Sequence, residues 1–413
     1  GGVRRVRPCD RGARGIGLAG GALAVGELAF ELADQLAHRF GGRRFVAARI
    51  LDGLLPVAFG LVDPDQVAQR LRRALVDLRD PNEVSRIEGF VAEMGGTPFH
   101  RPAWLHAVER GTGQRAVGLA VIKHGSVTGW LPLTEVHSPL FPRALVSSGF
   151  AVGGGPLCVD GSTALDLCRA ATELAARRSC ASVELRGGDA PADWAVRTDS
   201  HAGFLAPLAA DDESQLLAIP RKQRAEVRKG LERDFTIEVG SGERDRTAHH
   251  AVYAESVRNL GTPVFPRSLF DAVLDTLDAD ILTLRLAGEP VASVLSLYHD
   301  GAVMPYWGGG TFAARATRAN ERMYFELMRH ARARGCHTFD FGRSKTGSGA
   351  FAYKKNWGFE PQPLAYATWT ACGASARDVD PNSAAHAAKI ALWKRMPLGL
   401  ANRLGPVIAR GLA

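Results

Sequence analysis

Short apolar runs alternate with amphipathic helical segments through most of this chain. The runs at 116–122 and 127–133 flank the polar residues KHGS, and this arrangement predicts a β-hairpin. Residues 162–178 have helical spacing and lead directly into a strand-like run at 181–186. The mixture of hairpins, strands and helices predicts an α/β (α+β) fold with mixed sheets.

The second half of the chain repeats this order of elements. Residues 281–299 read as two strands about a turn, a helix is predicted at 317–334, and a strand follows at 337–341. Each predicted strand after a helix is next to an Arg and a Gly. In each half a cysteine also lies four positions before a carboxylate, in the pairs Cys180–Glu184 and Cys336–Asp340. The repeat indicates a duplicated α/β domain.

Four regions follow from these patterns. Residues 1–80 hold 13 Arg but no Lys, Trp or Tyr, and we expect an Arg-, Gly- and Ala-rich extension there. Within it, 65–79 has helical spacing, so the extension is expected to be disordered or partly helical, with a small helical domain as the alternative. The remaining regions are a first lobe at 82–210, a second lobe with the candidate site at 211–372, and a helical tail at 373–413.

Composition narrows the class of protein. Of 413 residues, 46% are hydrophobic and 23% are charged, which excludes global disorder. The net charge of +8 would indicate nucleic-acid binding only where the positive residues cluster. No apolar run reaches the roughly 18 residues of a membrane span. The six cysteines form no C-x-x-C pair and have no His at metal-ligand spacing, which favours reduced thiols and no metal site.

The strongest candidate for chemistry is residues 339–359, FDFGRSKTGSGAFAYKKNWGF. Four cationic residues and a glycine-rich loop follow a predicted strand, which is typical of a pocket for phosphate or carboxylate. The stretch lacks the Walker A pattern, and a solvated loop is the alternative. The residues expected to contact substrate here are Arg343, Ser344, Lys345, Lys355 and Trp357.

A second cluster of positive charge lies at 220–229, on a predicted helix. Six basic and two acidic side chains fall within 221–233. Three of the arginines share one helix face, which suits a nucleotide diphosphate or an RNA backbone, whereas a solvated helix face is the alternative. The candidate binding residues are Arg221, Lys222, Arg224 and Arg228.

A third candidate is the sequence MPYWGGG at 304–310. Glycines that follow a strand allow close approach of a substrate, and their N–H groups could hold an oxyanion. The candidate binding residues are Tyr306, Trp307, Gly308 and Gly309, and the alternative is that the two aromatics belong to the core. The segment 149–156 is the counterpart in the first half. No G-x-S-x-G, H-E-x-x-H or Ser-His-acid pattern is present, so a covalent nucleophile is not indicated.

Several motifs in the same order resemble one family. They are RKQRAEVRKG, ESVRNLGTPVFP, PYWGGG, a helix beginning RANERMY, the stretch 339–359 and the tail 392–412. Together they resemble the FemAB-related proteins associated with exosortase/PEP-CTERM gene clusters. The resemblance covers roughly residues 84–413 and leaves residues 1–80 outside.

The resemblance implies two tandem lobes of the GNAT acyltransferase fold. FemAB proteins transfer an amino acid from aminoacyl-tRNA to an amine of a peptidoglycan precursor, and an F-K-x-x-F-G-like motif gives them an active-site lysine. The matching stretch here is 353–358, although its two aromatics differ in type from those of the motif. The resemblance carries the role of the lysine over to Lys354, and Tyr353 beside it is the second catalytic candidate. Asp340 is the candidate general base, or a structural partner of Arg343 or Lys354.

The resemblance also implies the substrates. We expect aminoacyl-tRNA as the acyl donor, no bound cofactor, and an envelope or exopolysaccharide precursor as the acceptor. Acetyl-CoA is the rival donor, although the GNAT pyrophosphate loop R/Q-x-x-G-x-G/A is not evident before 317–334. A cytoplasmic location, with contact at the inner face of the membrane, is expected.

A non-catalytic module that binds polysaccharide or RNA is the alternative function. The arrangement of 353–357 and 306–310 discriminates between the two functions, because catalysis needs both segments at one cleft. Lys354 is expected to be exposed and to contribute little to stability.

Overall fold

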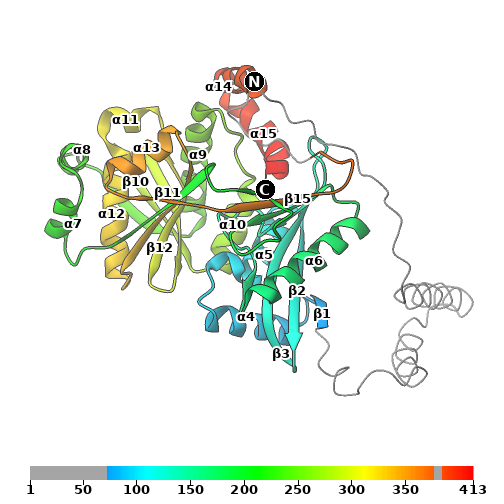
Figure 1. Cartoon of the computed structure of the whole chain (residues 1–413). Coiled ribbons are helices and arrows are strands. Elements are labelled where there is room, and N and C mark those ends of the chain that lie inside the picture. Colours follow the sequence, from blue (N-terminus) through cyan, green and yellow to red (C-terminus); the bar gives the residue numbers. More distant parts are fainter. Residues whose placement is uncertain (1–71, 376–383, 413) are drawn as a thin grey trace, which may run out of the picture. The chain divides into compact units, whose positions relative to one another are not determined.

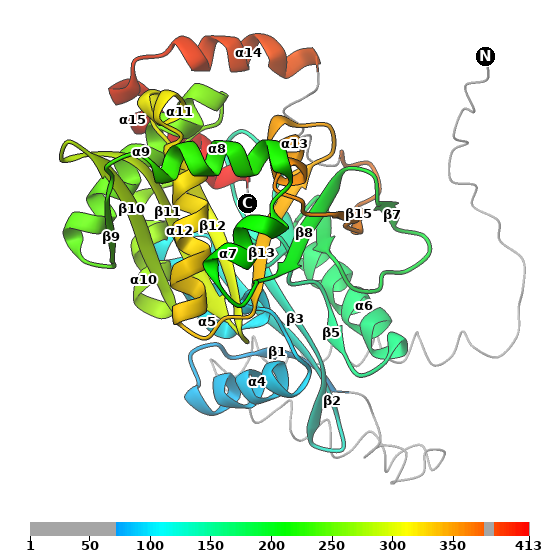
Figure 2. The same cartoon turned by 90° about the vertical axis from the view of Figure 1, so that its left-hand side faces the viewer.

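The computed structural model of this chain describes residues 72–375 and 384–412, which form two lobes and a helical tail (Figure 1). The prediction of an α/β fold with two mixed sheets is confirmed. Each lobe is built on one of these sheets, and helices cover the sheets (Figures 1 and 2).

The first lobe contains an eight-stranded sheet in the order β1-β2-β3-β4-β6-β15-β7, and β5 pairs with β3. Its strands are β1 (Arg72–Val76), β2 (Arg115–Lys123), β3 (Ser126–Val136), β4 (Ala144–Ser147), β5 (Leu157–Cys158), β6 (Ser182–Arg186), β7 (Ala195–Arg197) and β15 (Tyr366–Thr370). Its helices are α4 (Pro81–Glu93), α5 (Pro102–Thr112) and α6 (Gly161–Arg177). The predicted hairpin is β2–β3, and the predicted helix at 162–178 is α6.

The second lobe contains a seven-stranded sheet in the order β14-β8-β13-β12-β11-β10-β9. Its strands are β8 (His201–Pro207), β9 (Thr236–Gly240), β10 (Ala279–Leu286), β11 (Glu289–His299), β12 (Ala302–Gly310), β13 (Thr338–Lys345) and β14 (Pro361–Pro363). Its helices are α7 (Asp212–Ala218), α8 (Arg221–Leu231), α9 (Glu243–Leu260), α10 (Arg267–Thr276), α11 (Phe312–Thr317), α12 (Ala319–Ala333) and α13 (Gly349–Asn356). The tail contains α14 (Ala384–Arg395) and α15 (Leu398–Ala409).

The internal repeat is visible in the strand pairing. Among the described strands, only β4 with β6 and β12 with β13 pair in parallel, at the same place in each sheet. The strands that carry Glu184 and Asp340 are therefore counterparts, as the sequence repeat predicted. Each sheet is completed by a strand from elsewhere in the chain, because β8 joins the second sheet and β15 joins the first. This exchange brings β13 and β15 together, because Arg343 of β13 donates a hydrogen bond to Tyr366 of β15.

One predicted helix is wrong where the structure describes it. Residues 72–76 of the stretch 65–79 form β1, which pairs antiparallel with β2 at the edge of the first sheet, and the earlier residues of that stretch lie outside the described part. The helical spacing was misleading because Leu75, one of its apolar positions, is 50% exposed. Hydrogen bonds to β2 satisfy the backbone of these residues instead.

The two lobes share a hydrophobic core. Trp104 of α5 stacks on Trp307 of β12 with 6.2 Å between ring centroids, and Phe270 of α10 meets Trp307 edge-on at 4.8 Å. Trp104 is fully buried and Trp307 is 4% exposed. Burial of large aromatic side chains from both lobes fixes one lobe on the other.

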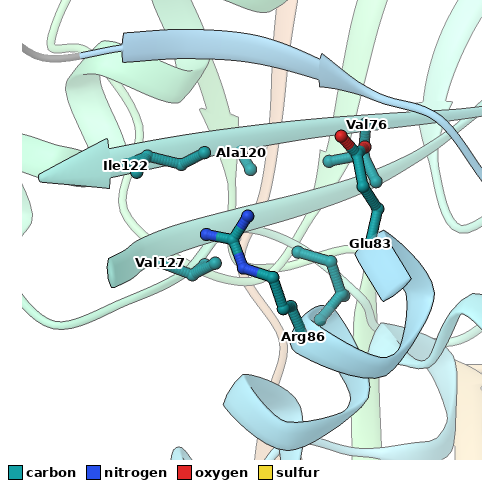
Figure 3. A pocket seen from close by; sticks show the side chains of 7 residues that line it. Val76, Glu83, Arg86, Ala120, Ile122 and Val127 are labelled. Atoms are coloured by element: carbon teal, nitrogen blue, oxygen red, sulfur yellow. The ribbon is translucent and has the colours of Figure 1, made fainter. Parts of the chain in front are cut away.

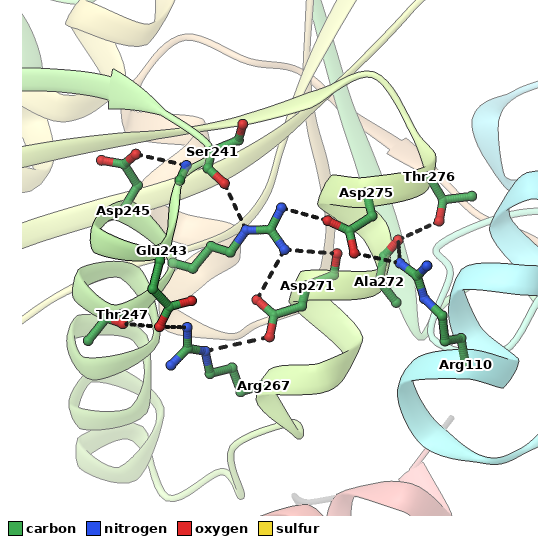
Figure 4. Close-up of polar contacts among 12 residues, drawn as sticks. Arg110, Ser241, Glu243, Asp245, Thr247, Arg267, Asp271, Ala272, Asp275 and Thr276 are labelled. Carbon is green, nitrogen blue, oxygen red and sulfur yellow. Dashed lines mark hydrogen bonds and ion pairs between the residues drawn. The ribbon is translucent and has the colours of Figure 1, made fainter.

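A network of ion pairs borders this shared core (Figure 4). Asp275 of α10 accepts from Arg110 of α5 at 2.9 Å and from Arg246 of α9 at 2.7 Å, so it connects the lobes. Asp275 and Arg110 are about half exposed, and such pairs contribute less than about 1 kcal/mol each. The aromatic core, and not the ion pairs, therefore dominates the attachment of the lobes. No described helix has the length and apolarity that crossing a bilayer requires.

Candidate functional site

The parallel strands β12 and β13 separate soon after they begin. They pair only at Ala302 with Thr338 and at Val303 with Phe339. Beyond this point β12 continues against β11, while β13 bulges between Asp340 and Arg343 and pairs with β8. Within the described part of the chain, the edge of β12 that faces β13 therefore has no strand partner from Met304 onward. Unpaired N–H and C=O groups on a strand edge can bind an extended substrate.

Asp340 is the first residue of β13 beyond the paired segment. Gly342 has a φ of +67°, a left-handed conformation that favours glycine, and its N–H donates to Oδ1 of Asp340 at 2.9 Å. Burial raises the pKa of the Asp340 carboxyl, while the Gly342 N–H and the charge of Lys354 oppose the rise. The result is a partly buried carboxyl group at the point of strand separation that binds a proton more readily than an exposed one.

Lys354 lies on α13, which packs over β13 and β8. Its Nζ donates to the carbonyl oxygen of Arg343 at 2.9 Å and lies 5.4 Å and 5.3 Å from the ring centroids of Phe204 and Phe341. The side chain is 9% exposed, so the expectation of an exposed lysine is wrong. Burial lowers the pKa of Lys354 to about 8, and Asp340 partly offsets this effect.

Arg343 connects this pair to the first lobe. Its Nη1 donates to the hydroxyl of Tyr366 at 2.8 Å, and that hydroxyl donates to the carbonyl of Val152 at 3.3 Å. Tyr366 belongs to β15, the strand that the end of the chain contributes to the first sheet. The strand exchange is therefore what brings Tyr366 to Arg343.

The loop after β4 also reaches the strands of the second lobe. The hydroxyl of Tyr306, on β12, donates to the carbonyl of Phe150 at 2.6 Å. Arg186 donates to the carbonyls of Ser148 and Ala151 at 3.3 Å and 2.8 Å. Ser148 and Phe150 have φ values of 41° and 63°, which are strained for residues with a Cβ. The Gly-rich segments of the two halves thus meet through Tyr306 and Phe150.

Positive side chains gather where the two sheets meet. Burial lowers the pKa of His201 to about 4, and the charges of Arg343, Lys345, Arg186 and Arg197 add to this effect. His201 is therefore uncharged at neutral pH, and the charge around it comes from the other four residues. Such a surrounding favours an anionic group such as a phosphate or carboxylate.

Tyr353 lies apart from the polar pair of Lys354 and Asp340. Its ring packs among aromatic rings, at 6.0 Å from Tyr324 and 6.3 Å from Trp357. The hydroxyl of Tyr353 and Nε1 of Trp357 are buried and interact with each other. Burial raises the pKa of Tyr353 well above its ordinary value. Catalysis by Tyr353 and substrate contact by Trp357 stay predictions.

The glycines at 308–310 lie inside β12, where they pair with β11, and do not follow the strand as expected. A Cβ at Gly309 would lie 2.3 Å from Oγ of Ser256 on α9, so the close packing of α9 requires glycine there. A Cβ at Gly308 would lie 2.9 Å from the side chain of Val294. Trp307 belongs to the core between the lobes.

The basic helix forms as predicted, at Arg221–Leu231, and lies across the end of α12 (Figure 2). Arg221, Lys222 and Arg228 are exposed. Arg224 is half-buried and donates to the carbonyl of Leu217 at 3.2 Å, so it is less available to a ligand than its neighbours.

Carboxylates occupy the beginnings of both helices that follow β12. The backbone N–H of Phe312, the first residue of α11, donates to Oε1 of Glu255 at 2.8 Å. Glu321 lies in the first turn of α12, and burial raises its pKa. Glu226 of α8 pairs with Arg318, which precedes α12.

The other candidate residues have less distinctive places. Ser344 is buried and its Oγ has no hydrogen-bond partner among the described residues, whereas Lys355 is exposed. Among the described residues, no group of His, Cys, Asp and Glu can hold a metal ion, and the cysteines there are free. A small hollow of about 30 Å³ lies between α4 and β1–β3, far along the chain from the candidate residues (Figure 3).

The structure thus brings together part of the predicted set. Lys354 donates to the Arg343 carbonyl and interacts electrostatically with Asp340, and the charge of Arg343 acts on Tyr306, whereas Arg221, Lys222 and Arg228 lie on a separate helix. The segments 353–357 and 306–310 do not line one cleft, because Tyr353 and Trp357 pack in the core of the second lobe and Trp307 packs in the core between the lobes. Tyr353 and Trp357 lie in the aromatic cluster with Tyr324, whose hydroxyl lies 3.4 Å from the position of a Cβ on Gly308.

Sequence reasoning missed three residues at this site. They are Arg186, His201 and Tyr366. The repeat carried a signal for Arg186, because it marks an arginine beside the strand in each half. No sequence pattern indicated Tyr366, because only the strand exchange brings this residue to Arg343.

Comparisons with known proteins agree with this architecture. Residues 221–355 match the family described as Acetyltransferase (GNAT) domain. The residues that are similar to this family lie in the lobe where β12 and β13 separate. No curated protein sequence matches the chain.

Solved structures show similarity over both lobes. The crystal structure of FemX superposes with a TM-score of 0.54 at 16% identity, over 69% of this chain and 95% of that one. A tandem GNAT protein from the clavulanic acid biosynthesis pathway has a TM-score of 0.49 at 12% identity, over 74% of this chain and 100% of that chain. L-PGS from Bacillus licheniformis has a TM-score of 0.46 at 15% identity, over 72% and 93%. The similarity to FemX shows the fold.

Proposed function

We propose that this protein is an aminoacyltransferase that moves an amino acid from aminoacyl-tRNA to an amine of a cell-envelope or exopolysaccharide precursor. The observation that carries the proposal is the buried ammonium group of Lys354, which donates to the Arg343 carbonyl and interacts electrostatically with Asp340 near the point where β12 and β13 separate. The GNAT match supports acyl transfer, and the similarity of the sequence motifs to FemAB-related proteins supports the aminoacyl donor. The association with exosortase/PEP-CTERM systems belongs to the same proposal.

The arrangement suits direct attack of an amine on an ester. The amine nitrogen bonds to the carbonyl carbon, and the carbonyl oxygen becomes an oxyanion. Lys354 has three N–H groups, of which one binds the Arg343 carbonyl, so the others can stabilise this oxyanion together with N–H groups on the unpaired edge of β12. The C–O bond to the tRNA ribose then breaks.

In this proposal Asp340 is the general base. Its carboxylate accepts the proton that the attacking amine loses, and the protonated Asp340 then gives this proton to the ribose oxygen as the C–O bond breaks. The raised pKa of Asp340 makes it a stronger base than an exposed carboxylate. Because an ester is already activated, positioning and electrostatic stabilisation are sufficient, and a covalent enzyme intermediate is not needed.

The helix termini favour aminoacyl-tRNA over acetyl-CoA. In GNAT domains a pyrophosphate would bind the N–H groups at the start of the helix after β12. Here Glu255 already accepts the N–H of Phe312, and Glu321 places another carboxyl group at the next helix. Two carboxyl groups repel a pyrophosphate, whereas the exposed cations Arg221 and Lys222 of α8 suit an RNA backbone.

A comparison of the two acyl donors tests the proposal. Purified protein is incubated with an amine acceptor and either a mixture of tRNAs charged with radiolabelled amino acids or radiolabelled acetyl-CoA. We expect label to move from tRNA to the acceptor and not from acetyl-CoA. Transfer from acetyl-CoA alone would overturn the aminoacyl assignment but keep acyl transfer. Transfer from neither donor, with binding of RNA or polysaccharide, would support a non-catalytic module instead.

The rate of transfer should depend on pH through Lys354 and Asp340. Lys354 must be charged, and its pKa is about 8, so we expect the rate to fall as the pH rises through about 8. Asp340 must be ionised, so the rate should also fall on the acid side, below the raised pKa of this carboxyl. A Lys354→Arg variant that keeps some activity should lose the alkaline fall. A rate that keeps rising above pH 9 would show that Lys354 acts in its neutral form.

A further inference from the structure

The tail helix α15 has an unusual orientation on the protein. The residues that it buries against the protein are its small ones, Ala401, Gly405 and Ala409. The residues that face solvent include its large apolar ones, Leu400, Leu404 and Val407, which are 47%, 42% and 56% exposed. A helix that only completed a core would turn its leucines inward.

The inward face is fixed by close contact. A Cβ on Gly405 would lie 2.9 Å from the backbone nitrogen of Val264, so the helix axis lies too close to the protein for a larger residue. The end of the tail is also held, because Nε2 of Gln114 donates to the carbonyl of Arg410 at 2.9 Å. The leucines therefore stay on the outside, and α15 cannot rotate to bury them without losing these contacts.

The charge of the tail is of one sign. Residues 384–412 include no Asp or Glu but five Lys and Arg. Four of these side chains are exposed in the structure: Lys394, Arg395, Arg403 and Arg410. Two further apolar side chains are exposed near the tail. Leu392 lies on α14 and is 68% exposed, and Leu260 lies at the end of α9 and is 62% exposed. Gly261, next to Leu260, lies against Ile390 of α14.

An apolar stripe on a tail whose charged residues at 384–412 are all positive matches an anionic lipid surface. Acyl chains receive the apolar side chains, while Lys and Arg meet the negative headgroups. A 12-residue helix spans about 18 Å and lies along a bilayer surface instead of crossing it. We propose that the outward face of α15, defined by Leu400, Leu404 and Val407, docks this protein on an anionic bilayer. This inference does not depend on the identity of the acyl donor or acceptor.

Vesicle binding by the full chain tests the inference without any substrate. The protein is sedimented with phosphatidylcholine vesicles that contain or lack phosphatidylglycerol. We expect binding to the anionic vesicles only, weakened by added salt because the headgroup attraction is screened. A Leu404→Glu/Val407→Glu variant should bind about tenfold more weakly, because it removes apolar contact and adds repulsion. Its transfer activity toward a water-soluble acceptor should be unchanged.

A matched control tests whether the loss of vesicle binding is specific to the α15 face or follows from replacing any exposed leucine by Glu. Leu217 on α7 is 61% exposed, and Leu217→Glu should bind vesicles as the wild type does. Equal binding by the α15 double variant, or no binding by the wild type, would overturn the inference. A wild-type dimer that the double variant converts to monomer, seen by light scattering in the absence of vesicles, would also overturn it, because a second copy would then cover this face.

Discussion

Replacing Lys354 by methionine will abolish transfer and leave the protein at least as stable as the wild type at neutral pH. Removal of one group that stabilises an oxyanion lowers kcat by about 10²–10³-fold, and loss of a buried charge should reach the upper end of that range. Methionine is similar in length and apolar, so it fills the space between Phe204 and Phe341 without leaving a charge there.

The effect of this substitution on stability follows from the pKa of Lys354. Burial lowers that pKa from 10.5 to about 8, which corresponds to a cost on the order of 3 kcal/mol when the folded protein carries the charge. The lost hydrogen bond to the Arg343 carbonyl is worth about 1 kcal/mol in the opposite direction. The free energy of unfolding of the variant should therefore equal or exceed that of the wild type.

The pH dependence of unfolding supplies an independent check. Between about pH 8 and pH 10.5 the unfolded lysine binds a proton that the folded one has lost, so stability rises with pH in this range. Urea denaturation at pH 7 and pH 10 should show this rise in the wild type relative to Lys354→Met. Lys355→Met is the control, because Lys355 is exposed on the same helix, and it should change neither stability nor transfer. Full transfer by Lys354→Met would remove this residue from the mechanism.

The lysine also shows where sequence reasoning succeeded and where it failed. The motif and the repeat placed Lys354, Asp340 and Arg343 in one region, because all three lie on β13 or on the helix that follows it. The burial of Lys354 was missed because β8, which supplies Phe204 beneath it, comes from a distant part of the chain. Local patterns report spacing along one element, whereas burial depends on the elements packed against it.

For the fold as well, the sequence predicted the local elements and missed the long-range pairings. The hairpin β2–β3 and helix α6 are local, and the repeated order of helix and strand marked the two lobes. The exchange of β8 and β15 has no local signature, because each is a short strand that finds its partner across the molecule. Tyr366 joined the site only through this long-range pairing. The helix predicted over residues 72–76 was wrong for a related reason, since an edge strand can carry apolar residues at helical spacing.

Replacing Gly155 by alanine will destabilise the protein and disturb the candidate site, whereas the same change at Gly153 will do neither. A Cβ at Gly155 would lie 1.9 Å from the carbonyl oxygen of Gly187 and 2.6 Å from its carbonyl carbon. Both are backbone atoms, so no change of side-chain rotamer relieves the overlap. At Gly153 the nearest atom, on Phe99, lies 3.9 Å away. Neither glycine has a positive φ, so the two substitutions differ only in their contacts.

The overlap forces the loop after β4 away from β6. This movement breaks the hydrogen bond from Gly155 to the Arg186 carbonyl and separates the Arg186 side chain from the loop carbonyls that it binds. We expect Gly155→Ala to lower the free energy of unfolding by about 2–3 kcal/mol in urea denaturation, and Gly153→Ala to change it by less than about 0.5 kcal/mol. Because Phe150 in this loop accepts from Tyr306, transfer by Gly155→Ala should fall even where the variant remains folded. Equal stability and equal activity of the two variants would show that the first lobe does not position the site.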